Sequence, residues 1–363
     1  MKRCFQLLLF AITFPFALHA QLVVTNGAQL KLTGDAVLTL QDIDLVNNGD
    51  FNQTTGTVRF TGAANNSISG SQATRIHLLQ MAKTGAAQLQ LQRTILIGSQ
   101  INFTSGLINL NNNNIELDAT ALLVGETETS RITGITGGYV QIITNLNAPS
   151  SANPGNLGAV ITSAQNLGST TIRRGHVAQT NVIAGKPSIH RYYDIIPSNN
   201  TGLNATLRMN YFDAELNGRT EAWLGLWRSN DNVNWTQAGY SSRDAAANFV
   251  QQSGINSFSR WTLSDNDFPT GVFDVFPDGT TGIKLWPNPT ANDLNVSVRV
   301  KKTVDATVWM VDMMGRVMVN YSVKLMAGAN QLHVNADHLP AGAYTLMITA
   351  EDGSKLQARL IKQ

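Results

Sequence analysis

Apolar and polar residues alternate along the chain with a period of two, in short bursts rather than in long runs. Between Leu22 and about Val124 this alternation is typical of strands that bury one face. Clusters rich in Gly and Asn, such as 47–50 and 111–114, separate the bursts and mark turns. No segment of this region keeps a helical period for more than two turns. The pattern predicts an all-β protein.

Two units in this region resemble each other. One runs from Gly56 to Phe60 and the other from Gly106 to Leu110, and each follows a short burst that contains a Phe. A glycine that leads a short strand, repeated at irregular spacing, predicts coils of a small parallel β-helix or solenoid over residues 21–129. An antiparallel sandwich would produce the same alternation and remains the alternative.

The rest of the chain divides into three parts by its pattern. Aromatic residues become denser over 130–267, and turn signals separate the strands there, which predicts a central β-sandwich. Pro and Gly then accumulate with little periodicity, which predicts a linker over 268–284. Six short alternating strands follow between Leu294 and Ile361, so residues 285–363 are expected to form a small C-terminal β-sandwich.

The N-terminus has the pattern of a secretory signal peptide. Lys2 and Arg3 precede an apolar run that ends at Leu18, and a small residue, Ala20, stands before the expected cleavage point. The run is too short to span a bilayer. Residues 1–20 are therefore predicted to be removed during export. Cys4, the only cysteine of the sequence, leaves with them, so the mature chain is expected to have no disulfide and no lipid anchor.

Composition narrows the choice of partner. Charged residues make up 14% of the sequence, against roughly 25% in an ordinary domain. The formal net charge is +2. So small a charge creates little long-range field, which argues against nucleic acid and anionic membrane surfaces as partners. The uncharged polar surface is typical of exported β-proteins.

The C-terminal residues carry a set of motifs in a fixed order. A Trp-Pro-Asn-Pro segment opens the set, an Asp and a Gly-Arg pair mark a central turn, a Gly and a Tyr mark a late hairpin, and a Lys stands near the end. The residues are Trp286, Pro287, Asn288, Pro289, Asp312, Gly315, Arg316, Gly342, Tyr344 and Lys362.

This ordered set resembles the C-terminal type A sorting domain of the type IX (Por) secretion system, over nearly all of 285–363. Two departures keep an apolar group in place: Trp286 stands where the family often has Tyr, and Met313-Met314 replace aliphatic residues. An ordinary sandwich module of the fibronectin type is the alternative.

Membership of the sorting-domain family would imply export through the periplasm and passage through a dedicated outer-membrane translocon. The domain is usually removed, and the cargo is then released or attached to surface lipopolysaccharide. The resemblance therefore implies a secreted or cell-surface location and partners in the type IX machinery.

The sequence offers no recognised catalytic, cofactor or metal site. The histidines outside the signal peptide have neither HExxH nor HxH spacing, and the mature chain lacks cysteine. These histidines are His77, His176, His190, His333 and His338. Neither a G-x-S-x-G nucleophile motif nor a glycine-rich phosphate loop occurs. We therefore predict no catalytic residue, no cofactor and no metal ligand.

A sugar site is conceivable in the central region, where carboxylates and aromatic residues lie near one another in the sequence. They are Asp194, Asp213, Glu215, Glu221, Tyr193, Trp223, Trp227 and Trp235. Glycoside cleavage needs two carboxylates across a cleft. The simpler interpretation, which we favour, is that Trp223 and Trp227 fill the sandwich core. The acidic residues at 213, 215 and 221 would then flank turns on the solvated face.

Other polar residues of this region also have plain structural interpretations. The Asn-rich segment 230–234 has oxygen ligands suited to calcium, but such residues also dominate metal-free turns. His190 is expected to pack within a strand. The favoured function is an exported structural or adhesin-like surface protein with a glycan or another surface ligand. The alternative is a polysaccharide-binding or polysaccharide-degrading protein.

Overall fold

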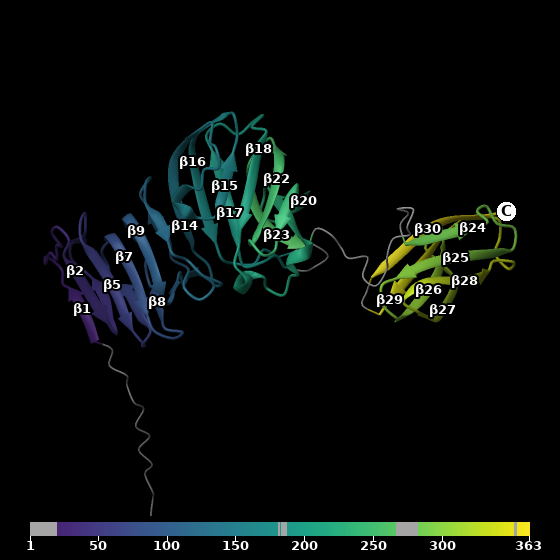
Figure 1. Cartoon of the computed structure of the whole chain (residues 1–363), viewed down its shortest axis with the longest axis horizontal. Helices are drawn as coiled ribbons and strands as arrows, with labels where there is room; N and C mark the ends of the chain where they lie inside the picture. The colour runs from purple at the N-terminus through teal and green to yellow at the C-terminus, as the bar shows by residue number, and fades with distance from the viewer. Residues whose placement is uncertain (1–19, 181, 183–186, 266–281, 352–353) are drawn as a thin grey trace, which may run out of the picture. The chain divides into compact units, whose positions relative to one another are not determined.

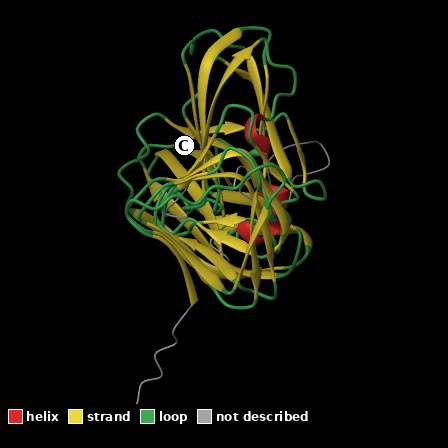
Figure 2. Ribbon diagram, turned by 90° about the vertical axis from the view of Figure 1, so that its left-hand side faces the viewer, coloured by secondary structure: helices red, strands yellow, loops and turns green. Residues whose placement is uncertain are grey.

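A computed structural model describes residues 20–180, 182, 187–265, 282–351 and 354–363. The predicted signal peptide, up to residue 19, and the linker over 266–281 lie outside these residues. Strands dominate the described chain, with three short 3-10 helices between them (Figure 2). The described residues form two compact units, one on each side of 266–281. The all-β fold class is confirmed.

The first thirteen strands are divided between two sheets, and within this region all paired neighbours run parallel (Figure 1). One sheet has the order β1-β3-β6-β8-β10-β13, and the other begins β2-β5-β7-β9-β11. The strands are β1 (Ala20–Val24), β2 (Val37–Gln41), β3 (Ile43–Asn47), β4 (Phe51–Asn52), β5 (Thr57–Gly62), β6 (Asn66–Ser69), β7 (Thr74–Lys83), β8 (Gln88–Leu91), β9 (Ile95–Ser105), β10 (Leu107–Asn109), β11 (Ile115–Leu117), β12 (Leu122–Val124) and β13 (Ile132–Thr133). This is a parallel β-solenoid of about six turns, as predicted, and the antiparallel alternative is wrong for this region.

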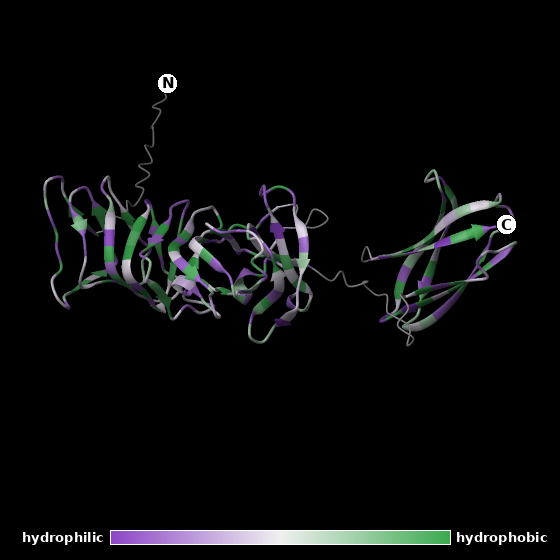
Figure 3. Cartoon of the chain, turned by 90° about the horizontal axis from the view of Figure 1, so that it is seen from above, coloured by the Kyte–Doolittle hydropathy of each residue, from purple (hydrophilic) through white to green (hydrophobic). Residues whose placement is uncertain are grey.

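Apolar residues of successive coils stack on one another inside the solenoid. Leu45 pairs in register with Ile68 and Ile68 with Leu91, and all three are fully buried. Alternation within each strand points the intervening polar residues outward. Bands of apolar and polar residues therefore alternate along the strands in Figure 3. Each coil can bury its apolar face only against its neighbours, which is why the sequence repeats.

The strand β14 (Tyr139–Asn147) joins the solenoid to the sandwich. It pairs parallel with β11 and antiparallel with the next strand of the sheet, so one sheet of thirteen strands runs through both regions. The order β15-β18-β22-β21 gives a second, antiparallel sheet. The remaining elements are η1 (Pro154–Asn156), β15 (Ala159–Thr162), β16 (Asn166–Gly175), β17 (Tyr192–Pro197), β18 (Ala205–Asn210), η2 (Asp213–Glu215), η3 (Glu221–Trp223), β19 (Leu224–Ser229), β20 (Thr236–Gly239), β21 (Ser242–Asp244), β22 (Phe249–Ile255) and β23 (Arg260–Asp265).

One hydrophobic core extends through the whole first unit, from Val24 to Leu263. Trp227 is buried as predicted, but it packs in a small separate cluster with Val182 and not in the main core. The prediction for Trp223 is wrong. Its side chain is 37% exposed, because it ends the short helix η3 just before the chain enters the sheet.

The second unit is a sandwich of two antiparallel sheets, ordered β24-β25-β28 and β27-β26-β29-β30. Its own core extends from Ile283 to Leu360. A first strand, β24, begins within the segment that the sequence marked as linker. The strands are β24 (Ile283–Trp286), β25 (Asp293–Val300), β26 (Val304–Asp312), β27 (Val317–Leu325), β28 (Gly328–Asn335), β29 (Gly342–Ala350) and β30 (Lys355–Lys362). Among the described residues, no helix has the length and apolar character needed to cross a membrane.

Candidate functional site

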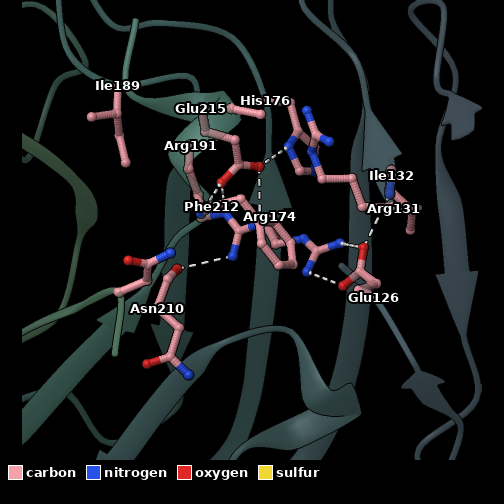
Figure 4. Close-up of polar contacts among 12 residues, drawn as sticks. Glu126, Arg131, Ile132, Arg174, His176, Ile189, Arg191, Asn210, Phe212 and Glu215 are labelled. Carbon is pink, nitrogen blue, oxygen red and sulfur yellow. Dashed lines mark hydrogen bonds and ion pairs between the residues drawn. The ribbon is translucent and has the colours of Figure 1, made fainter. Parts of the chain in front are cut away.

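A buried ionic cluster lies where the last solenoid coil meets the sandwich (Figure 4). Arg174 of β16 is 1% exposed, and both of its terminal nitrogens donate to the carboxylate of Glu126 at 2.8 Å. Glu126 follows β12 in the last coil. Arg174 also donates to the Leu157 carbonyl at 3.3 Å. This bidentate salt bridge connects the last solenoid coil to the sandwich.

A second pair completes the cluster. Arg191 donates to Glu215 Oε1 at 2.9 Å, and its Nε lies 2.8 Å from Oε2. It also donates to the Asn210 carbonyl at 2.9 Å. Glu215 is 3% exposed, so the prediction that it lies on the solvated face is wrong. The one-turn helix η2 turns this side chain inward, where Arg191 and His176 surround it.

The cluster fixes its own charges. Burial alone would raise the pKa of Glu215, but the attraction of Arg191 and the hydrogen bond from His176 outweigh burial and hold it at about 2. Arg174 outweighs burial in the same way and lowers the pKa of Glu126. Burial lowers the pKa of His176 to about 4, so this imidazole is neutral. Its Nδ1 lies 3.1 Å from Glu215 Oε1 and, beside a carboxylate, carries the hydrogen.

A pocket of about 530 Å³ opens over this cluster. Glu126, Arg174 and Arg191 line it from the cluster. Further walls come from η1, from the end of β18 and from the turn before β22, including the side chains of Asn156, Asn210, Phe212, Ala247 and Asn248. The pocket combines a few placed polar groups with buried ion pairs, which makes it the candidate binding site of the first unit.

In the second unit, the opening Pro-Asn-Pro segment lies against the last strand. The Asn288 amide donates to the Arg359 carbonyl at 2.8 Å and accepts from the Ile361 amide at 2.9 Å. Thr290 then bridges to Lys362, whose side chain is largely buried. Trp286 is 41% exposed at the end of β24. Pro287 and Pro289 flank the amide that makes the contact.

The central turn is held by one carboxylate. Asp312 Oδ1 accepts from the backbone of Met314 and of Arg316 at 2.9 Å each, and Arg316 Nε donates to Oδ2 at 2.7 Å. The hydrogen bond from the Arg316 backbone is the main reason that the pKa of Asp312 is lowered. Gly315 adopts a φ of 80°, which favours glycine.

The sheet register brings these separate motifs together. Asp312 pairs with Tyr344, and Gly342 pairs with Lys362, which bridges in turn to Thr290. Tyr344 also donates its hydroxyl to the Pro340 carbonyl at 2.7 Å. Residues from both ends and the middle of the segment therefore converge at one end of this sandwich.

A family model supports the same assignment. Residues 284–363 match the model described as "Secretion system C-terminal sorting domain". The chain is a cargo protein of the type IX secretion system. Its sorting domain implies export through the periplasm to the medium or to the outer cell surface, and interaction with the type IX machinery.

Comparisons of the whole cargo are less informative. No curated protein matches it. Among solved structures, a calcium-binding mutant of Bacteroides uniformis β-glucuronidase 2 is 11% identical, with a TM-score of 0.23 over 47% of this chain and 29% of the other. A "putative beta-galactosidase" from Bacteroides fragilis is 13% identical, with a TM-score of 0.23 over 44% and 33%. The cargo thus spans about a third of the length of these chains, and TM-scores this low carry no argument about function.

The structure does not bring the sequence-selected carboxylates of the cargo to one cleft. Asp194 pairs with Arg260 at 2.7 Å, Asp213 accepts from Asn248, and Glu221 accepts from Tyr211. His190 is half-buried but precedes β17, so the prediction that it packs within a strand is wrong. Asp231 organises its own turn through the backbone of Val233 and Asn234. Among the described residues, no group of three or more His, Cys, Asp or Glu side chains could hold a metal ion.

Sequence reasoning missed the ionic cluster. A signal existed in β16, where Thr170, Ile172 and Arg174 share one face by alternation. Thr170 and Ile172 are buried, so Arg174 must be buried as well and must find a counter-charge. Its partners, Glu126 and Leu157, lie on other elements, and no local pattern marks them.

Proposed function

We propose that this type IX cargo acts outside the cell as a structural or adhesin-like binding protein, either secreted or held on the cell surface. In this proposal the converged residues of the sorting domain, from Trp286 to Lys362, are what the secretion machinery recognises. Attachment to surface lipopolysaccharide after removal of the domain is one outcome of that recognition. The body, residues 20–265, would then supply the contact with a glycan or another surface.

The observation that carries the proposal is the wide polar face of the thirteen-stranded sheet. Two rows of outward-facing polar residues follow the strand register across the solenoid and into the sandwich. The first row is Thr39, Arg59, Gln80 and Asn102, and the second is Glu116, Gln141, Arg173, Asp194 and Arg260.

Neighbours on this face hold one another in place. Arg59 donates to Gln80, and Arg173 donates to Gln141, both at 2.7 Å. Arg173 also lies over the Tyr139 ring, 4.8 Å from its centroid. A pre-ordered polar face suits many weak contacts with an extended polymer, which together give firm attachment.

The ionic cluster supports binding over hydrolysis. Cleavage of a glycosidic bond needs a carboxylic acid that is still protonated near neutral pH, which means a raised pKa. The pKa values of Glu126 and Glu215 are both lowered, so neither can serve as that acid. At this cluster, the binding form of the polysaccharide alternative is therefore favoured over the degrading form.

Attachment of cells to polysaccharide-coated surfaces would test the proposal. A type IX-competent host that displays the full chain should attach more than the same host without it, and should release no reducing ends. The combined variant Arg59→Thr, Gln80→Thr and Asn102→Thr should lose most of this gain, because it removes the side chains that make contact while keeping residues that favour strands.

The matched control changes the other solenoid sheet, with Gln88→Thr, Gln90→Thr and Asn109→Thr. These three residues are half-buried and polar like the first set. Equal loss with both sets would contradict a role for the wide face. Release of reducing ends would overturn the binding function in favour of an enzyme.

A further inference from the structure

We infer that the 530 Å³ pocket over the Glu126–Arg174 pair is a recognition site for a neutral, hydroxyl-rich ligand, a sugar unit by chemical class. The inference rests on the proposed binding function and assigns it a specific site, whose lining includes none of the wide-face residues. Three features of the pocket support it: the charge balance, the hydrogen-bonding groups and the rigidity of the walls.

The charge balance disfavours an ionic ligand. Arg174 and Arg191 line the pocket, but each is already paired with a carboxylate. Glu128, also in the lining, accepts from the backbone of Asp213 and Ala214 at 2.9 and 3.0 Å. An anion would approach Glu126 and Glu128, and a cation would approach the two arginines. A neutral ligand meets neither repulsion.

The pocket walls offer amides that are not fully used. Asn156 donates to Leu123 and Asn248 donates to Asp213, which leaves both side-chain oxygens without a partner among the described residues. Asn210 makes no side-chain hydrogen bond within the described structure. An amide carries a donor and an acceptor side by side, which matches a pair of neighbouring hydroxyl groups.

Backbone geometry explains why asparagine occurs at two of these positions but not at the third. Asn156 and Asn248 adopt φ values of 53° and 51°, a region where asparagine is favoured over most residues. Asn210 lies in the regular strand β18, so its backbone makes no such demand. Asn210 is therefore the most direct candidate for a ligand contact.

The floor of the pocket is pre-organised. The Arg174–Glu126 and Arg191–Glu215 pairs are buried and make two contacts each, and Arg191 also lies over the Phe212 ring, 5.1 Å from its centroid. A rigid wall loses little entropy when it binds a ligand. Arg131 also lies over the Phe212 ring, 5.8 Å from its centroid, so the ring is part of the ordered floor.

Calorimetric titration of the full chain would test the inference. The probes are soluble neutral gluco-, manno- and xylo-oligosaccharides, compared with anionic oligouronates and cationic chitosan oligosaccharides. We expect at least one neutral series to bind, with a Kd on the order of 1 mM or tighter, and both charged series to bind at least about tenfold more weakly.

Two variants locate the binding. Ala247→Trp, on an exposed turn, should fill the pocket mouth and weaken binding at least about tenfold. Asn210→Leu removes only the amide and should weaken it several-fold. Ala63→Trp, on an exposed solenoid turn outside the pocket lining, is the matched control and should change nothing. The unfolding temperatures of all variants should be measured alongside.

Three results would overturn the inference: no neutral oligosaccharide binds the native chain, a charged series binds better, or Ala247→Trp binds as the native chain does. None of these results would contradict attachment through the wide face, which the cell-attachment experiment tests separately. If the wide-face variant no longer attaches to surfaces but still binds oligosaccharides in the titration, the wide face and the pocket act independently.

Discussion

Arg174 and Glu126 form a salt bridge that differs from those on the protein surface. Both side chains are at most 10% exposed, whereas Arg316 of the exposed pair with Asp312 is 72% exposed. Solvent screens the exposed pair, so it is expected to contribute little to stability. Removing one partner of a buried pair strands a charge away from water and typically costs about 3–5 kcal/mol. The buried cluster therefore fixes how the solenoid meets the sandwich.

His176 gives the same cluster a dependence on pH. Its pKa is about 4 in the fold and 6.5 in a model peptide, so the unfolded chain takes up a proton first as pH falls. Its stabilising contribution is complete above about pH 6.5 and is lost between pH 6.5 and 4. Glu215 adds a loss at lower pH, because its pKa rises from about 2 to its ordinary value on unfolding.

We predict that His176→Gln makes the free energy of unfolding less dependent on pH between about pH 6.5 and 4. Gln can still donate to Glu215 but does not titrate. One proton corresponds to a slope of about 1.4 kcal/mol per pH unit in the free energy of unfolding. Urea unfolding between pH 7 and pH 4 would measure the slope. A variant whose slope matches that of the native chain would show that the titrating group lies elsewhere.

The sequence predicted individual strands and turns better than any other feature of the fold. Period-two alternation located the solenoid strands, and Gly56 and Gly106 do occupy turns with positive φ. The number of coils could not be counted, because the coils differ in length: Leu45 pairs with Ile68 but Leu89 pairs with Ile108. The inward turn of Glu215 depends on a helix of three residues, too short to leave a period in the sequence.

The contact between coils can be tested at one glycine. A Cβ at Gly70 would lie 2.2 Å from the Asn47 carbonyl oxygen of the preceding coil. Gly85 also has a positive φ, but nothing lies within 4 Å of its Cβ position. Gly85→Ala should therefore cost only the backbone strain, about 1–2 kcal/mol. Gly70→Ala should cost roughly 1–3 kcal/mol more in the free energy of unfolding. It overpacks two coils, and the φ of 111° at Gly70 is also less favourable for Ala than the φ of 61° at Gly85.

Chemical denaturation of both variants measures this difference. A cost for Gly70→Ala no larger than that for Gly85→Ala would mean that neighbouring coils can move apart freely. The same comparison should leave the unfolding of the sorting domain unchanged, because that domain has a core of its own.

In the whole molecule, the sorting domain is the second unit, whereas the proposed binding belongs to the first. The sequence could predict the sorting domain because its motifs have a fixed order, and the family model confirms it over 284–363. The pocket could not be predicted, since its walls come from the last solenoid coil, η1, β18 and the turn before β22, which are far apart in the sequence. Their proximity depends on the sheet register.

Deleting residues 285–363 should leave the body of the cargo in the periplasm. The body has its own continuous core, so it should remain folded and protease-resistant there. Cell fractionation with an antibody to the body would measure its location, with the full chain as control. Normal appearance of the truncated chain on the surface or in the medium would contradict a sorting role for the deleted residues.

The reversal of strand direction at β14 also determines how the body should respond to force. Three residue pairs join β14 to β11, whereas nine join it to β16. A load applied across the sheet should therefore open the seam beside β11 first. The Glu126–Arg174 pair and the contacts of Glu128 join the two sides of that seam and would resist its opening. A protein that grips a moving surface would then yield in one defined place, while the sandwich stays folded and the solenoid remains connected to it by the chain.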